Sequence, residues 1–175
     1  MDSGTLIVAA VFIAICIVPF LITGRKYKKH KKQLVNALNQ LAEQNNSSIS
    51  LRETKGNFGI AKDEKESRIF FARLTGQTLV TRDVDLSVYN RCKMNNVVRI
   101  ADGGEKVTER IELVFSPART DITQVVLELY NVEYDNLTLS GELQVAEKWE
   151  QLIGNVLNIS GKINSPTSRK KKKVA

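Results

Sequence analysis

Seven short runs in which apolar and polar residues alternate follow one another between residues 49 and 129. A period of two places alternate side chains on one face of an extended strand, and turn residues between such runs are typical of antiparallel hairpins. The clearest turn is Asp102-Gly103-Gly104, because glycine readily adopts the positive φ that tight hairpin turns require. The runs lie at residues 49–52, 58–61, 68–74, 83–88, 97–100, 111–115 and 125–129. The pattern predicts a mainly β domain of seven antiparallel strands.

An amphipathic helix is predicted before the first run, at residues 31–45. Its apolar residues recur at helical spacing and are Leu34, Val35, Leu38, Leu41 and Ala42. The stripe covers two heptads at most, which is too short to argue for a coiled coil. It favours packing on the chain's own domain, with a homo-oligomeric seam through residues 31–45 as the alternative.

A second amphipathic helix is predicted at residues 141–159, after the last run. Its apolar residues recur every three or four positions, with Trp149 near the centre. Ser140 is predicted as the N-cap and Gly161 as the C-terminal stop. The sequence as a whole therefore predicts an α+β chain that is mainly β.

Residues 5–23 form a 19-residue run without a charged side chain. A helix of that length covers about 28 Å, which is enough to span the hydrocarbon core of a bilayer. Basic residues follow the run and none precedes it, so the positive-inside rule places the N-terminus outside and the rest in the cytoplasm. We therefore predict a single-pass protein of a bacterial inner membrane that contacts the lipid bilayer through this helix. Anionic lipid head groups are expected to contact the basic residues after it, Arg25, Lys26, Lys28, Lys29, Lys31 and Lys32.

The formal net charge of +7 resides at the two ends of the chain. When residues 25–32, residues 169–173 and Asp2 are left out, the rest of the chain has fifteen basic and eighteen acidic residues. A mildly acidic domain does not provide the basic face that phosphate neutralisation needs. The distribution of charge therefore argues against a nucleic-acid partner.

The order of seven antiparallel strands followed by one helix with a central Trp resembles the pleckstrin-homology-like fold, including its bacterial relatives. The resemblance covers about residues 48 to 160, and its last part reads ELQVAEKWEQLIGNVL. It implies a strongly bent sheet or split barrel, divided into four and three strands and closed by the C-terminal helix. It also implies binding of a lipid, peptide or protein. The basic residues that could face a ligand around the first two strands are Arg52, Lys55, Lys62 and Lys65, and acidic residues are interspersed among them.

Little in the sequence suggests catalysis. The domain has no histidine, because His30 lies in the basic cluster, and it has no glycine-rich phosphate loop. Asp83 and Asp85 lie two positions apart and would share one face of a strand. Cys92 lies between two basic residues, which could lower the pKa of an exposed thiol. An unrecognised hydrolase would need a pocket lined by these three residues, and we predict neither an enzyme nor a metal or other cofactor.

These observations predict a membrane-anchored binding or scaffold module that recognises a protein partner at the inner face of the membrane. The main alternative is a domain that senses anionic lipid. The predicted segments are an extracytoplasmic N-terminus (1–4), a transmembrane helix (5–23), a basic juxtamembrane segment with the amphipathic helix (24–47), the β domain with its C-terminal helix (48–161) and a disordered basic tail (162–175).

Overall fold

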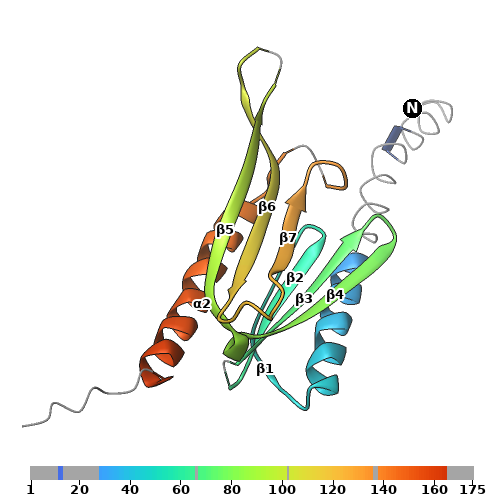
Figure 1. Cartoon of the computed structure of the whole chain (residues 1–175). Coiled ribbons are helices and arrows are strands. Elements are labelled where there is room, and N and C mark those ends of the chain that lie inside the picture. Colours follow the sequence, from blue (N-terminus) through green and yellow to red (C-terminus); the bar gives the residue numbers. More distant parts are fainter. Residues whose placement is uncertain (1–11, 14–27, 66, 102, 136–137, 165–175) are drawn as a thin grey trace, which may run out of the picture.

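The computed structural model describes residues 12–13, 28–65, 67–101, 103–135 and 138–164, with side chains described as far as residue 159. The described strands form two antiparallel sheets (Figure 1). The first sheet has the order β1-β2-β3-β4, with strands β1 (Ile49–Lys55), β2 (Phe58–Asp63), β3 (Arg68–Thr75) and β4 (Thr78–Asp85). The second has the order β5-β6-β7, with strands β5 (Tyr89–Ile100), β6 (Lys106–Pro117) and β7 (Val125–Asn131). The prediction of a mainly β domain with four plus three antiparallel strands and a C-terminal helix is confirmed, while the two sheets stay separate and are not closed into a barrel.

The fourth predicted run is split between a strand and a short helix. β4 ends at Asp85, and Leu86–Val88 forms the 3₁₀ helix η1. The Asp85 carboxylate accepts a hydrogen bond of 2.9 Å from the Ser87 N–H and so caps the helix. A side chain that accepts a hydrogen bond from the backbone N–H two residues later competes with strand pairing and can end a strand. The alternating sequence pattern did not predict this end.

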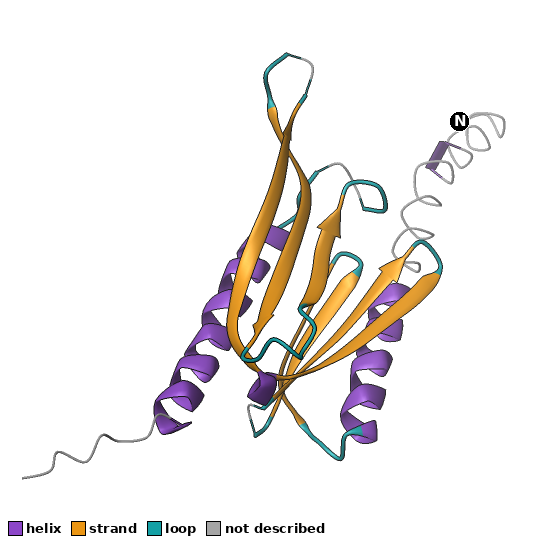
Figure 2. Cartoon of the chain, in the orientation of Figure 1, coloured by secondary structure: helices purple, strands orange, loops and turns teal. Residues whose placement is uncertain are grey.

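The first sheet is buried on both faces because its strands alternate apolar side chains toward two different cores. Ile69 and Phe71 of β3 face the main core, which the second sheet and the C-terminal helix complete. Phe70 and Ala72 face the opposite side, where they pack with Leu34 and other residues of the helix at residues 28–44. Figure 2 shows this N-terminal helix lying along the first sheet.

The N-terminal helix approaches the first sheet closely at one glycine. A Cβ on Gly59 of β2 would lie 3.0 Å from Leu38 Cδ1 and 3.6 Å from Leu34 Cβ. Leu34, Ala37, Leu38 and Ala42 are all buried in this contact. The apolar stripe of the predicted helix therefore packs on its own domain, the alternative that the short stripe favoured.

The C-terminal helix α2 (Glu142–Asn164) lies against the second sheet and fills the main core with its apolar face (Figure 1). Trp149 is completely buried, and its indole N–H donates to Glu53 Oε2 of β1 at 3.1 Å. The predicted end at Gly161 is wrong, because the helix continues to Asn164; a glycine inside a helix costs only about 1 kcal/mol relative to alanine. Ser140 does not act as the predicted N-cap acceptor, since its hydroxyl donates to Glu142 Oε1 at 2.8 Å.

The localisation prediction is wrong. Apart from Phe12 and Ile13, the predicted transmembrane segment 5–23 lies outside the described residues. Across the described ranges, no helix combines the length and the apolar character needed to cross a membrane. The reason is that both longer helices, residues 28–44 and α2, are apolar on one face only and use that face for the domain's own cores. We therefore assign no bilayer contact to the basic residues that follow the run: Arg25 and Lys26 lie outside the described residues, and Lys28, Lys29, Lys31 and Lys32 are exposed on the N-terminal helix.

Candidate functional site

A buried arginine joins the two sheets. Arg73 of β3 is only 3% exposed and lies on the inward-facing side of the strand, in phase with Ile69 and Phe71. Its Nη2 lies 2.7 Å from Asp135 Oδ2, and its Nη1 donates to the Glu128 carbonyl of β7 at 3.2 Å. Its Nε lies 3.4 Å from Glu128 Oε1 without forming a hydrogen bond. The alternating pattern would place an apolar residue at this position, and the described acidic groups that compensate its charge are Glu128 of β7 and Asp135 after β7.

Asp135, in the segment between β7 and α2, is the centre of this network. Besides Arg73, it accepts hydrogen bonds from Asn57 Nδ2 at 2.7 Å and from the Asn131 N–H at 2.8 Å. Asn57 belongs to the β1–β2 turn, so one carboxylate ties a turn of the first sheet to the end of the second. These contacts fix Asp135 beside the β1–β2 turn and the end of β7.

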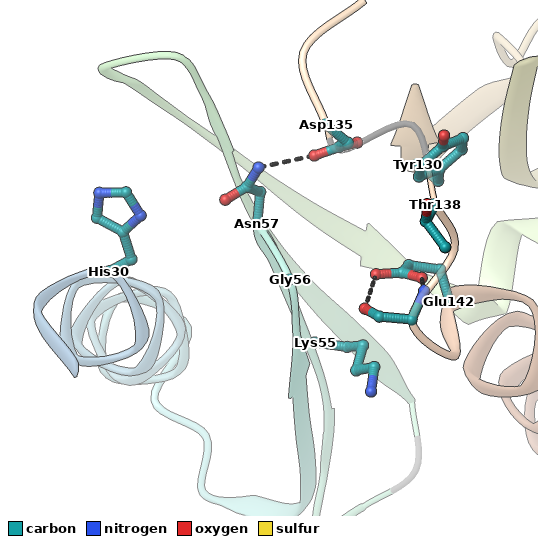
Figure 3. A pocket seen from close by; sticks show the side chains of 9 residues that line it. His30, Lys55, Gly56, Asn57, Tyr130, Asp135, Thr138 and Glu142 are labelled. Atoms are coloured by element: carbon teal, nitrogen blue, oxygen red, sulfur yellow. Dashed lines mark hydrogen bonds between the residues drawn. The ribbon is translucent and has the colours of Figure 1, made fainter. Parts of the chain in front are cut away.

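Beside this network lies a cavity of about 230 Å³. Its lining comes from the β1–β2 turn, the end of β7, the β7–α2 segment, the start of α2 and the N-terminal helix (Figure 3). The lining residues are His30, Lys55, Gly56, Asn57, Tyr130, Asp135, Thr138, Ser140 and Glu142. Eight of the nine carry a polar or charged side chain, so the lining is rich in groups that can form hydrogen bonds or ion pairs.

Two glycines allow the β1–β2 turn and the start of α2 to meet at this cavity. Gly56 has φ +51°, and a Cβ there would lie 3.1 Å from Glu142 Oε1. Gly141 has φ +115°, and a Cβ there would lie 3.2 Å from Lys55 Nζ. Each position has a positive φ and a close neighbour, so each has two reasons to be glycine. The result is that an ammonium and a carboxylate approach the same junction from opposite sides.

Glu142 is a buried carboxylate, 7% exposed, whose oxygens accept the Ser140 N–H at 2.6 Å and the Ser140 hydroxyl at 2.8 Å. Its place in the first turn of α2 is favourable for a negative charge. Among the described residues, no ion pair joins a basic side chain to Glu142, or an acidic one to Lys55.

The neighbouring Tyr130 lies in a negatively charged environment on this side of the cavity. Burial raises the pKa of its hydroxyl, and the charges of Asp135 and Glu142 raise that pKa further. The phenol therefore stays protonated at neutral pH.

The four basic residues predicted to face a ligand do not form one site. Lys55 lines the cavity, whereas Arg52 donates to Asn39 Oδ1 of the N-terminal helix at 3.0 Å and lines a shallow hollow of about 520 Å³ there. Lys62 and Lys65 line neither hollow. The cause is the β1–β2 hairpin, which places Lys55 at its turn and Lys62 near the opposite end of β2.

Asp83 and Asp85 share one face of β4, as the pattern predicted, and both are bound by Arg68 of β3. Arg68 Nη1 contacts Asp83 Oδ2, and its Nη2 lies 3.3 Å from Asp85 Oδ2. Partial burial and the nearby Asp85 raise the pKa of Asp83 despite the charge of Arg68. Burial acts against Asp85 too, but hydrogen bonds from Ser87 and the charge of Arg68 lower its pKa. Neither aspartate lines the two hollows described above, so their contacts match a structural pair rather than the pocket that a hydrolase requires.

Cys92 does not meet the condition under which its neighbours could lower the pKa of its thiol, because the side chain is not exposed. Its side chain is buried in the main core, and burial, with the nearby Glu150, raises its pKa to about 12. The thiolate is the reactive form, so a raised pKa suppresses reaction at neutral pH.

We therefore expect iodoacetamide at pH 8 to modify Cys92 in the folded protein at least about 100-fold more slowly than in urea. Site-resolved mass spectrometry of the intact chain separates Cys92 from Cys16. Comparable rates in the two states would show that the thiol is accessible and would contradict its place in the core.

Sequence reasoning missed Arg73, Asp135 and Glu142. One signal was available for Arg73: in the run RIFFARL it falls in phase with the apolar Ile69 and Phe71. An arginine at a core-facing position of a strand requires a buried acid, but the pattern could not say which one.

Comparison with known proteins leaves the chain without a relative: no protein-family model, no curated protein and no solved structure matches it.

Proposed function

We propose that this chain is a binding module that recognises a protein partner through one end of its two-sheet domain. The β1–β2 turn, the β3–β4 turn, the β5–β6 hairpin and the segment after β7 all point toward that end (Figure 1). Loops carried by a rigid scaffold are the usual place for binding residues.

The observation that carries the proposal is the set of exposed apolar side chains in these loops. Ile100 is 74% exposed beside the turn of the β5–β6 hairpin, and Val98 is exposed two residues before it. Leu79 lies next to the β3–β4 turn and Tyr134 in the segment after β7, both exposed. Apolar side chains that several loops expose at one end are typical of a protein interface rather than of a solvated surface.

The β5–β6 hairpin extends well beyond the neighbouring strand β7 (Figure 1). Its turn is closed by the Ala101 N–H, which donates to the Glu105 carbonyl at 2.9 Å, and Gly103 and Gly104 have φ of +108° and +83°. Such a turn lets β5 and β6 continue beyond the sheet as a paired ribbon that a partner can contact from either face.

The element order supports a binding role as well. Four strands, three strands and a helix with a buried Trp149 resemble the pleckstrin-homology-like arrangement, whose members mostly bind rather than catalyse. The separation of Arg52, Lys55 and Lys62 provides no lipid-binding cluster, and we therefore favour a protein partner over the lipid-sensing alternative.

The experiment places a photo-reactive benzoylphenylalanine at Ile100 of the full chain, in the cells that produce it. We expect a discrete crosslinked species with one partner, and recovery of that partner should fall about tenfold or more with Ile100→Asp. Val126, which is exposed at the start of β7, is the matched position for the crosslinker, and Ile159→Asp on α2 is the matched substitution. Equal crosslinking from Ile100 and Val126, or full recovery of the partner with Ile100→Asp, would refute the proposal.

A further inference from the structure

The cavity beside Asp135 contains two opposite charges that do not pair with each other. Glu142 offers a buried carboxylate, and Lys55 offers an ammonium whose Nζ lies close to Gly141, the residue before Glu142. No ion pair joins the two, and neither has another ionic partner among the described residues. A buried carboxylate without a cation is unfavourable unless something else compensates it.

The rest of the lining limits which ligand could compensate both groups. Asp135 is already neutralised by Arg73 and saturated by Asn57 and the Asn131 N–H, so it has little capacity for another cation. Thr138 adds a hydroxyl to the lining, whereas the Ser140 hydroxyl already donates to Glu142 and the Asn57 amide already donates to Asp135. Glu142 and Lys55 are therefore the groups that select a charged ligand.

The size of the space points to a small molecule. Drug-sized ligands occupy pockets of about 300–1,000 Å³, and this cavity measures about 230 Å³. Figure 3 shows Tyr130, Thr138 and Glu142 on one side and His30 on the helix opposite, so the space lies between the loop end of the domain and the N-terminal helix. A molecule with one ammonium, one carboxylate and a short side chain fits this volume and this pair of charges.

We propose that the cavity binds a free α-amino acid as its zwitterion, with the ligand ammonium on Glu142 and the ligand carboxylate on Lys55. The two charged groups then gain ionic partners that the described part of the chain does not supply, through charge-assisted hydrogen bonds. This site is separate from the partner surface proposed at the β5–β6 hairpin, so a negative result for one proposal does not contradict the other.

The first measurement is isothermal titration of the full chain with the twenty standard L-amino acids, one at a time. We expect at least one to bind, and the best binder is then compared with its N-acetyl derivative, which lacks the ammonium, and its methyl ester, which lacks the carboxylate. Each derivative should bind the unaltered protein about tenfold or more weakly. Failure of all twenty amino acids to bind would overturn the proposal.

Two substitutions then test which residue meets which charge. Glu142→Gln should weaken the zwitterion and the methyl ester about tenfold and leave the N-acetyl derivative unchanged. Lys55→Met should weaken the zwitterion and the N-acetyl derivative and leave the methyl ester unchanged. Glu147→Gln and Lys65→Met remove the same charges from exposed positions and should change nothing. A merely structural role of Glu142 or Lys55 would weaken all three ligands alike, and that result would refute the assignment.

Thr138→Phe provides a test that leaves both charges in place. Thr138 is exposed at the rim, so a larger side chain can enter the cavity without disturbing the buried network. We expect loss of amino-acid binding by about tenfold or more with an unchanged melting temperature. If Glu142→Gln does not fold, Thr138→Phe tests the proposal in its place. Unchanged amino-acid binding to Thr138→Phe would show that the ligand does not occupy this cavity.

Discussion

Replacing Arg73 with methionine should lower the free energy of unfolding by about 3–5 kcal/mol. The substitution keeps an unbranched apolar stem but leaves Asp135, 11% exposed, without its cation. It also leaves Glu128 without the guanidinium that lies beside its carboxylate and carbonyl. The effect is large because removing one partner of a buried ion pair leaves an uncompensated charge.

Equilibrium unfolding in urea, followed by circular dichroism on the full chain, measures this change. The matched control is Arg119→Met, because Arg119 pairs with Asp121 at 2.9 Å with both side chains largely exposed. That control should change the stability by no more than about 0.5 kcal/mol.

A double substitution sharpens the same prediction. Asp135→Asn combined with Arg73→Met removes both charges, so the pair should be less destabilising than the sum of the single changes. A loss below about 1 kcal/mol for Arg73→Met alone would mean that the arginine does not stabilise the junction between the sheets.

Trp149→Ala should lower the free energy of unfolding by about 3–5 kcal/mol. Trp149 is the largest fully buried side chain of the core, and its removal opens a cavity between α2 and the sheets. It also removes the hydrogen bond to Glu53, whose Oε2 would keep only Lys148 at 2.8 Å.

Ile159→Ala is the control on the same helix, because that side chain is exposed and should contribute less than about 0.5 kcal/mol. Trp149→Phe separates packing from the hydrogen bond, and we expect it to cost less than the alanine change. Circular dichroism is the suitable signal, since the substitution removes the chain's single tryptophan. Equal effects of Trp149→Ala and Ile159→Ala would contradict the burial of this side chain.

Much of the fold could be predicted from short-range patterns. The alternating runs correspond to the seven strands, and turns at Gly56, Gly76 and Gly103-Gly104 separate neighbouring strands. Errors arose where a local side-chain contact stopped an element, as at Asp85, or where packing continued one past a glycine, as at Gly161. The largest error was the localisation, which relied on an uncharged run and the basic residues after it, whereas no helix in the described ranges is long and apolar enough to cross a membrane.

Little of the candidate site could be predicted from the sequence. Of the four basic residues predicted to face a ligand, only Lys55 lines the cavity, because hairpin geometry separates the others. Glu142 and Asp135 come from segments that look like ordinary polar connections in the sequence. Their importance depends on what lies opposite them in space.

The sequence by itself determined the strand order, the turns and the two amphipathic helices, because periodicity and glycine conformation act over a few residues. The tertiary structure alone decided that Arg73 meets Asp135, 62 positions away, and that Asn57 meets the same carboxylate from 78 positions away. It also decided that Lys55 and Glu142 reach one cavity without pairing. Local patterns do not encode such contacts, because the free energy of a buried charge depends on partners that only the folded chain brings together.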